Sequence, residues 1–343
     1  MEHVDVLVVG GGPGGLACAT LLAQKGVQVV LVERKSVIGP KVCAGGITWH
    51  GLINLVPETL IERAFPEQII CSDRQRLVIR ESNPIIATVS RENLGQWMAK
   101  EAQNAGVRIL AASRLVTCTQ HEAILEIEGR GQRTLKYTHL VGADGSNSRV
   151  RQMLGVPTEL VGLGLNAMIP GSFPRMEWHI RPALFGSGYA WIFPHASAYS
   201  VGAYADNQRY SASQLKLQFI QWCDQQNLPL NPGAIRAGLV NYDYRGVRFG
   251  KGFLVGDAAG LASGLTGEGI YPALISGQVV ARMILDSLYP ALELTRLVRR
   301  HRKHAQMVRV AGRYPRLGSL LVELLLVLLR WHVIDFHKLE MAD

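Results

Sequence analysis

Cysteine is scarce in this sequence, and its spacing excludes two common kinds of site. The 343 residues include five cysteines, at positions 18, 43, 71, 118 and 223, and no Cys-x-x-Cys pair. An odd number of widely spaced cysteines argues against a disulfide framework and against a zinc site, so we expect no metal, and it fits a reducing compartment. The apolar residues 4–9 have no basic segment before them and no cleavage site after them, so we expect no secretory signal and a cytoplasmic protein.

Long apolar runs are missing as well. The run at residues 317–329 has 13 residues and contains Glu323, whereas a membrane-spanning helix needs about 20. Acidic residues are missing from 296–316, where eight Lys or Arg residues carry almost all of the net charge of +9.

Two interpretations of this basic and apolar segment stay open. Residues 296–331 could bind an anionic membrane surface, which would make the protein peripheral at the membrane. Alternatively, a C-terminal helix pair could complete a substrate cavity or a dimer contact. Nucleic-acid binding is not expected, because the basic residues lack interleaved aromatic residues and a known module.

A strand–turn–helix–strand pattern occupies residues 4–34. Apolar strands at 4–9 and 27–32 flank a helix at 16–25, as in a parallel sheet that is buried on both faces. The turn contains Gly-x-Gly-x-x-Gly, and the acidic residue at the end of the second strand could bind a ribose hydroxyl. This pattern predicts a dinucleotide site but does not separate FAD from NAD. The residues expected to contact the dinucleotide are Gly10, Gly12, Pro13, Gly14, Gly15, Glu33 and Arg34.

Further elements predict a fold in which this domain is interrupted. We expect helices over 91–105, with Ser90 as N-cap, over 214–226 and over 269–286. Residues 77–80 and 85–89 predict a hairpin, and short strands are expected at 137–141 and 253–255.

These elements predict an α/β protein with a second sheet. Residues 161–205 are rich in aromatic and β-prone residues, which indicates an antiparallel sheet. We expect a discontinuous Rossmann-type FAD-binding domain with an inserted antiparallel-sheet substrate domain and C-terminal helices. The predicted ranges are 1–68, 90–157 and 246–290 for the FAD-binding domain, 69–89 and 158–245 for the substrate domain, and 291–343 for the C-terminal helices.

Two later motifs resemble those of FAD-dependent hydroxylases and reductases. Residues 141–151, with Asp144 and Gly145, resemble their "DG" motif, and residues 254–259, with Gly256 and Asp257, resemble their "GD" motif. The resemblance implies that Asp257 binds the ribityl chain of the flavin and that Arg91 reaches the FAD. Taken alone, Asp144 could form a turn and Asp257 could cap a helix, but the order of the motifs favours FAD.

The segment after the "GD" motif opens the helix expected over 269–286. Its glycines would let backbone amides approach a flat ring, and the positive end of the helix would stabilise negative charge on a reduced flavin by about 0.3–1 kcal/mol. A flexible loop before a core helix is the alternative. The residues expected to bind the flavin here are Gly264, Gly267, Glu268, Gly269 and Ile270.

Two features resemble the geranylgeranyl reductase family over residues 1 to about 290. Residues 189–194 (YAWIFP) resemble its YxWxFP signature, and residues 40–46, with Cys43, Ala44 and Gly45, resemble its Lys-x-Cys-x-Gly loop near the flavin. The resemblance implies that reduced FAD reduces isolated C=C bonds of a polyprenyl or similar apolar lipid. The chain has no second GxGxxG motif, so the electron donor could be NAD(P)H, ferredoxin or another protein.

Cys43, Tyr189 and Trp191 are the candidate catalytic residues. Tyr189, Trp191 and Phe193 alternate along a strand and therefore share one face, which could line an apolar tunnel. That face could instead pack on the core of its own sheet, and Cys43 could be a small buried hydrophobic residue. Two other functions stay open: an FAD-dependent monooxygenase or halogenase, and a non-catalytic, membrane-associated FAD-binding protein.

Overall fold

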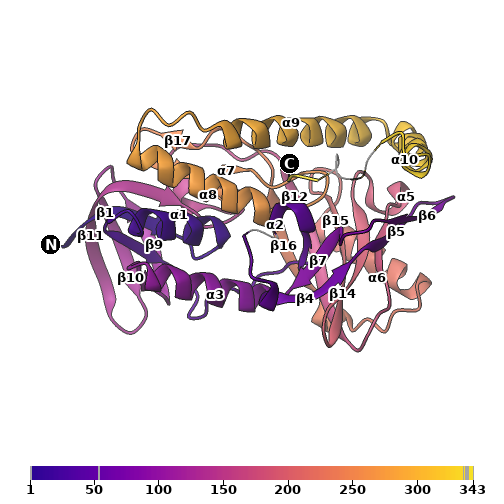
Figure 1. Ribbon diagram of the computed structural model, residues 1–343, viewed down its shortest axis with the longest axis horizontal. Coiled ribbons are helices and arrows are strands. Elements are labelled where there is room, and N and C mark those ends of the chain that lie inside the picture. The colour runs from indigo at the N-terminus through magenta and orange to yellow at the C-terminus, as the bar shows by residue number, and fades with distance from the viewer. Residues whose placement is uncertain (1, 53–54, 335, 337–339, 343) are drawn as a thin grey trace.

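The protein has three β-sheets and a set of covering helices, described from a computed structural model over residues 2–52, 55–334, 336 and 340–342 (Figure 1). The helices are α1 (Pro13–Ala23), α2 (Trp49–Leu52), α3 (Arg91–Asn104), α4 (Arg149–Met153), α5 (Pro182–Phe185), α6 (Ala212–Gln225), α7 (Gly256–Ala259), α8 (Ile270–Leu285), α9 (Leu292–Arg313) and α10 (Pro315–Arg330). Short 3-10 helices occur at Glu58–Leu60 and Pro232–Ala234. Among the described residues, no helix is both long and apolar enough to cross a membrane.

The largest sheet has eight strands. They are β1 (Glu2–Val9), β2 (Val29–Val32), β8 (Arg108–Leu110), β9 (Ser113–Cys118), β10 (Glu122–Ile127), β11 (Gly131–Gly142), β17 (Arg248–Phe249) and β18 (Gly252–Leu254). Its centre is parallel, in the order β18-β11-β1-β2-β8. The apolar side chains of β1 and β2 are buried in the main core, as the sequence predicts for a sheet covered on both faces.

Small residues allow α1 to pack closely on its neighbours. A Cβ at Gly15 would lie 2.1 Å from the carbonyl oxygen of Gly10 in the turn, and one at Gly277 in α8 would lie 2.2 Å from that of Gly14. α1 therefore packs tightly between the sheet and α8, and it also contacts α3. This packing places the start of α8 beside the start of α1, although about 250 residues separate them.

The second sheet has seven strands. They are β5 (Glu67–Cys71), β6 (Arg76–Arg80), β12 (Val161–Pro170), β13 (Met176–His179), β14 (Tyr189–Pro194), β15 (Ala198–Asp206) and β16 (Arg236–Asn241), in the order β16-β12-β15-β14-β13-β5-β6. All neighbours are antiparallel except β13 and β5. One face packs on α6, through Phe219 and Trp222, and the other carries Trp191 and Phe193.

The third sheet shows that the predicted hairpin at 77–80 and 85–89 is wrong. Its strands are β3 (Gly46–Thr48), β4 (Ile61–Phe65) and β7 (Ile86–Val89), in the order β3-β7-β4. β6 instead pairs with β5 through a tight turn in which Ser72 Oγ accepts hydrogen bonds from the backbone N–H groups of Arg74 and Gln75. All four residues of β7 are buried, so this strand is stabilised between two others in a separate sheet.

The other predicted elements are found close to their expected positions. Ser90 caps α3 and accepts a hydrogen bond from Asn93 N at 3.2 Å. The helix expected over 214–226 is α6, the one expected over 269–286 is α8, and the second sheet lies where it was predicted. The mixed α/β class is confirmed. The division into domains stays a prediction, and the third sheet takes strands from both sides of the boundary expected at residue 68.

The C-terminal helices lie along one edge of the molecule. α9 lies over α8, and α10 lies at the far end, next to α5 and β6 (Figure 1). The side chains of residues 315–317, including Arg316 and Leu317 of the predicted basic and apolar segments, lie outside the described part of the chain.

Candidate functional site

A cavity of about 910 Å³ extends from the glycine turn after β1 to the inner side of α10. This is near the upper end of the range for small-molecule sites, about 300–1,000 Å³. Its walls come from the large sheet, the seven-stranded sheet, the loops before α7 and α8, and the C-terminal helix.

The glycine turn brings backbone close to the cavity. Gly10 has φ +111°, and a Cβ there would lie 2.3 Å from the carbonyl oxygen of Ala143. A Cβ at Gly12 would have only the carbonyl oxygen of Ala143 nearby, at 3.9 Å, apart from the residues next to it in the chain. The cavity side of the turn is therefore open. Gly12 is also the N-cap of α1, with Pro13 at the first helical position and no side-chain cap. The free amides of this helix start could therefore bind a phosphate.

Glu33 holds the turn from the end of β2. Its Oε2 accepts a hydrogen bond from Gly11 N at 2.7 Å, and its Oε1 accepts one from Lys35 N at 3.0 Å. A carboxylate oxygen can accept more than one hydrogen bond. Because Glu33 also borders the cavity, it could accept one from a ribose hydroxyl.

Arg91 provides a direct test of whether the residues present fit a dinucleotide. It lies at the start of α3 and lines the cavity. Its Nε and Nη1 atoms are buried and have no hydrogen-bond partner among the described residues. Buried guanidinium donors are almost always satisfied, and a phosphate oxygen is a strong partner for them. An orphaned arginine beside an open helix N-terminus fits the pyrophosphate of FAD.

The two aspartates of the later motifs differ in their surroundings. Asp144 accepts hydrogen bonds from the backbone N–H groups of Arg149 (2.7 Å) and Val150 (3.2 Å), so its carboxylate supports the start of α4. Asp257 lies within α7, whose N-cap is Val255, and does not cap that helix. Its Oδ2 lies 2.9 Å from Lys41 Nζ and 2.9 Å from Ser146 Oγ at the cavity wall.

The loop before α8 brings a carboxyl group to the cavity. Glu268 accepts hydrogen bonds from Thr48 Oγ1 (3.4 Å) and from Met341 N (3.0 Å). Burial raises the pKa of Glu268 to about 7, and Glu340 adds to this shift, whereas the bond from Met341 and the charge of Arg300 oppose it. Near pH 7 this carboxyl group can therefore carry a proton.

Aromatic side chains form one wall of the cavity. Tyr189, Trp191 and Phe193 all line it from β14, which supports the tunnel interpretation of their alternation. Trp178 of β13 completes this wall, with its ring centroid 5.2 Å from that of Tyr189 and 4.7 Å from that of Phe193. The sequence argument missed Trp178, although its alternation with Ile180 is a signal that it faces the cavity.

The C-terminal helix closes the apolar end. Leu325, Leu326 and Leu329 of α10, together with Phe336, line the cavity. This observation supports the interpretation in which the C-terminal segment completes a cavity. No lining residue in this helix could be predicted from the sequence, because which face of α10 meets the cavity depends on how the helix docks.

The structure brings the predicted site residues together around this one cavity. All of them line it except Gly15, Gly45 and Gly264. These three form close packing contacts instead: a Cβ at Gly45 would lie 2.5 Å from His195, and one at Gly264 would lie 2.8 Å from the ring of Tyr242. Cys43 is half-buried at the wall, where its sulfur accepts a hydrogen bond from Gly45 N at 3.4 Å.

Comparisons with known proteins agree with this geometry. Residues 3–167 match the family described as FAD binding domain. Digeranylgeranylglycerophospholipid reductase 2 of Methanosphaera stadtmanae is 30% identical over 323 residues, covering 84% of this chain and 80% of the relative.

Solved structures share the fold. A geranylgeranyl bacteriochlorophyll reductase-like protein from Thermoplasma acidophilum has a TM-score of 0.79 at 21% identity, covering 91% of this chain and 87% of its own. A myxobacterial FAD-dependent halogenase has a TM-score of 0.67 at 17% identity, covering 88% and 80%. From the site and from the relatives together, the chain belongs to the geranylgeranyl reductase family of FAD-dependent oxidoreductases.

Proposed function

We propose that this protein reduces isolated C=C bonds of a polyprenyl lipid with FAD as its cofactor. The observation that carries the proposal is the continuity of the cavity. One end has an open helix N-terminus and an orphaned arginine, and the other end is lined by aromatic and aliphatic side chains from β13, β14 and α10. A cofactor with a pyrophosphate and an apolar chain would therefore meet within one water-poor space.

The polar end would hold FAD. The backbone N–H groups of Gly12 and Gly14 and the guanidinium of Arg91 would bind the pyrophosphate, and Glu33 would bind the adenosine ribose. Asp257, held by Lys41 and Ser146, would accept a hydrogen bond from the ribityl chain. The loop at 264–270 and the loop with Ala44 and Gly45 would border the flavin ring. FAD supplies a hydride when it is bound and reduced.

The apolar end would hold the lipid. Tyr189, Trp191 and Trp178 present ring faces and edges to the cavity, while α10 covers it from the other side. Packing against these side chains would exclude water from the double bond and keep the chain extended. Phe193 has the same position and would extend this wall.

The second carbon of the double bond needs a proton, and Glu268 is the group best placed to give it. Tyr189 is a poor donor, because its hydroxyl already donates to the carbonyl oxygen of Thr266 and burial raises its pKa. Cys43, which also lines the cavity, is a second candidate. Because burial raises the pKa of Glu268 to about 7, this carboxyl group can carry a proton near neutral pH, and we expect it to regain the proton from solvent between turnovers.

The first prediction concerns Arg91. Arg91→Met should weaken FAD binding about 10- to 100-fold, because a hydrogen bond to a charged group contributes about 1.5–3 kcal/mol. The apo protein should keep its stability, since Nε and Nη1 of Arg91 have no hydrogen-bond partner among the described residues. FAD titration followed by flavin fluorescence, with urea unfolding of the apo form, measures both. Arg130→Met, at an exposed arginine, is the control; equal FAD affinity in the two variants would contradict the role of Arg91.

The second prediction tests the activity itself. Under anaerobic conditions, the dithionite-reduced protein should be reoxidised by a geranylgeranyl lipid, and mass spectrometry should show a gain of two hydrogens per bond reduced. Chemical reduction makes the result independent of whether NAD(P)H or ferredoxin is the natural donor. No reoxidation by any isoprenoid, with rapid oxygen-dependent turnover of an aromatic substrate, would support a monooxygenase or halogenase instead. A flavin that dithionite cannot reduce would support a non-catalytic FAD-binding protein.

The third prediction concerns the proton donor. In wild type, the single-turnover rate of lipid reduction should fall as the pH rises through about 7, because Glu268 loses its proton. Glu268→Gln should lower the rate by about 100-fold or more and remove this decline with pH. FAD affinity should not change. If Cys43→Ser has the larger effect and Glu268→Gln leaves the pH profile unchanged, the cysteine is the donor.

The outer face of α10 suggests how a lipid substrate could be reached. Leu320, Leu324 and Trp331 are 62%, 51% and 74% exposed, although Leu326 and Leu329 of the same helix are buried against the cavity. The neighbouring helix α9 has exposed cations at Arg296, Arg299, Arg302, Lys303, Arg309 and Arg313. We infer that these two helices bind an anionic membrane surface, with the mouth of the cavity near the lipid.

The fourth prediction tests this membrane contact. Leu320→Glu combined with Leu324→Glu should weaken binding to vesicles that contain anionic lipid by about tenfold or more, because an inserted Leu contributes about 1.5–3 kcal/mol. Leu217→Glu is a matched control, since Leu217 is 69% exposed on α6. Vesicle flotation measures binding. If wild type does not bind and the double variant instead dissociates a dimer in analytical ultracentrifugation, α10 is a subunit contact.

A further inference from the structure

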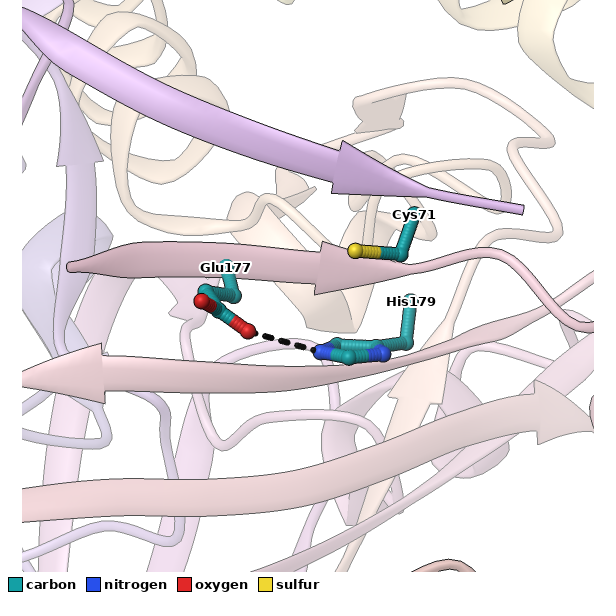
Figure 2. Close-up of side chains that lie close together, drawn as sticks. All are labelled: Cys71, Glu177 and His179. Carbon is teal, nitrogen blue, oxygen red and sulfur yellow. Dashed lines mark hydrogen bonds and ion pairs between the residues drawn. The ribbon is translucent and has the colours of Figure 1, made fainter. Parts of the chain in front are cut away.

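A second cluster of reactive side chains lies in the seven-stranded sheet. Cys71 ends β5, and Glu177 and His179 belong to β13, which pairs with β5 in parallel register so that Cys71 and His179 are opposite each other. The ligand atoms of the three side chains all lie within 4.8 Å of one another, and Glu177 Oε2 is 3.1 Å from His179 Nε2 (Figure 2). Strand pairing therefore sets the spacing of all three groups.

This cluster is separate from the cavity. Side chains alternate along a strand, so Trp178 points to the opposite face from Glu177 and His179, and it is Trp178 that lines the cavity. Ile70 and Ile180, the sequence neighbours of Cys71 and His179, also line the cavity. His179 instead packs against Trp222 of α6, with ring centroids 5.1 Å apart. The cluster lies on the α6 side of the sheet.

The surroundings hold the groups in place but leave the histidine incompletely satisfied. His179 is only 3% exposed, and its Nδ1 is buried with no hydrogen-bond partner among the described residues. Arg76 lies 3.6 Å from Glu177 Oε1 and leaves Oε2 facing the histidine. One oxygen of Glu177 is therefore held by Arg76, and the other lies beside the imidazole of His179 and the thiol of Cys71. This is the arrangement of a metal ligand with a supporting partner.

We propose that Cys71, Glu177 and His179 bind one zinc ion. Sulfur, imidazole nitrogen and carboxylate oxygen are the ligands that Zn²⁺ takes in proteins, and the thiol excludes Mg²⁺ and Ca²⁺. Three protein ligands leave the fourth tetrahedral position for water. Thiolate and carboxylate together balance the charge of the ion, so Arg76 remains compatible with the site.

Such an ion would act on the cavity through β13. It would fix both flanking residues of Trp178, whose ring packs on Tyr189 and Phe193 in the aromatic wall. Zinc would therefore help to position this wall, and its binding does not depend on which lipid the cavity accepts.

The fifth prediction is one zinc ion per chain. The FAD-bound protein is first freed of metal by a chelator and dialysis. It should then bind one Zn²⁺ per chain in a competition titration, and it should bind no Mg²⁺ when Mg²⁺ is the only metal ion added. Co²⁺ should give the absorption of a cobalt–thiolate bond in the difference spectrum. Cys71→Ser and Glu177→Gln should each lower zinc affinity by at least about 10- to 100-fold, since even supporting partners of metal ligands contribute that much. Both substitutions nearly conserve side-chain volume, so the flavin spectrum should stay unchanged.

A matched control separates this site from any other thiol. Cys118 is also half-buried but lies on β9 in the large sheet, so Cys118→Ser should bind zinc as wild type does. Zinc binding that survives Cys71→Ser, or wild-type protein that takes up no zinc above a chelator blank, would overturn the proposal. Neither result would bear on the reduction of lipids.

Discussion

The close contact between α1 and α8 is the constraint on which the site depends. Gly14 of α1 and Gly277 of α8 allow the two backbones to approach where any side chain would collide: a Cβ added at Gly14 would lie 3.0 Å from the carbonyl oxygen of Ala273, and one at Gly277 would lie 2.2 Å from that of Gly14. The start of α8 is thereby fixed beside the start of α1. Two segments from opposite ends of the chain then form one cavity wall, with the glycine turn on one side and Glu268 on the other. A larger residue at these glycines would separate the two halves of the site.

The same cavity combines a polar surface at one end with an apolar surface at the other. At its polar end, hydrogen-bond donors are buried without partners among the described residues, as Nε and Nη1 of Arg91 show. Its apolar end is built from a sheet face and a helix that would otherwise bury these side chains in a core. The relative named digeranylgeranylglycerophospholipid reductase 2 shares the family, whereas the reductase-like structure and the halogenase share the fold. The fold alone therefore does not select the reaction, and our proposal of lipid reduction rests on the apolar end of the cavity and on the carboxyl group of Glu268 that lines it.

Much of the polar end could be predicted from sequence because its residues follow local rules. A strand, a glycine turn and a helix identify the first motif, and Glu33 follows at a spacing set by the next strand. The apolar end could be predicted only in part. The alternation of Tyr189 and Trp191 shows that they share a face, but not that Trp178 joins them in the same wall or that Leu329 of α10 lines the same cavity.

The errors have the same origin. Residues 77–80 and 85–89 look like a hairpin, yet β6 and β7 pair with other strands, because strand partners are decided by burial and by distant segments. Cys71, Glu177 and His179 are unremarkable in sequence, since two of them are more than 100 residues from the first. Only the pairing of β5 with β13 brings them together.

The central claim is that FAD and an apolar chain occupy one continuous cavity. A crystal structure of the protein with FAD and a geranylgeranyl lipid tests it most directly. We expect the pyrophosphate at Gly12 and Arg91, the flavin ring between the loops of Gly45 and Gly267, and the lipid between Trp178 and α10. A flavin ring directed away from the aromatic wall, or a lipid bound outside the cavity, would contradict this account.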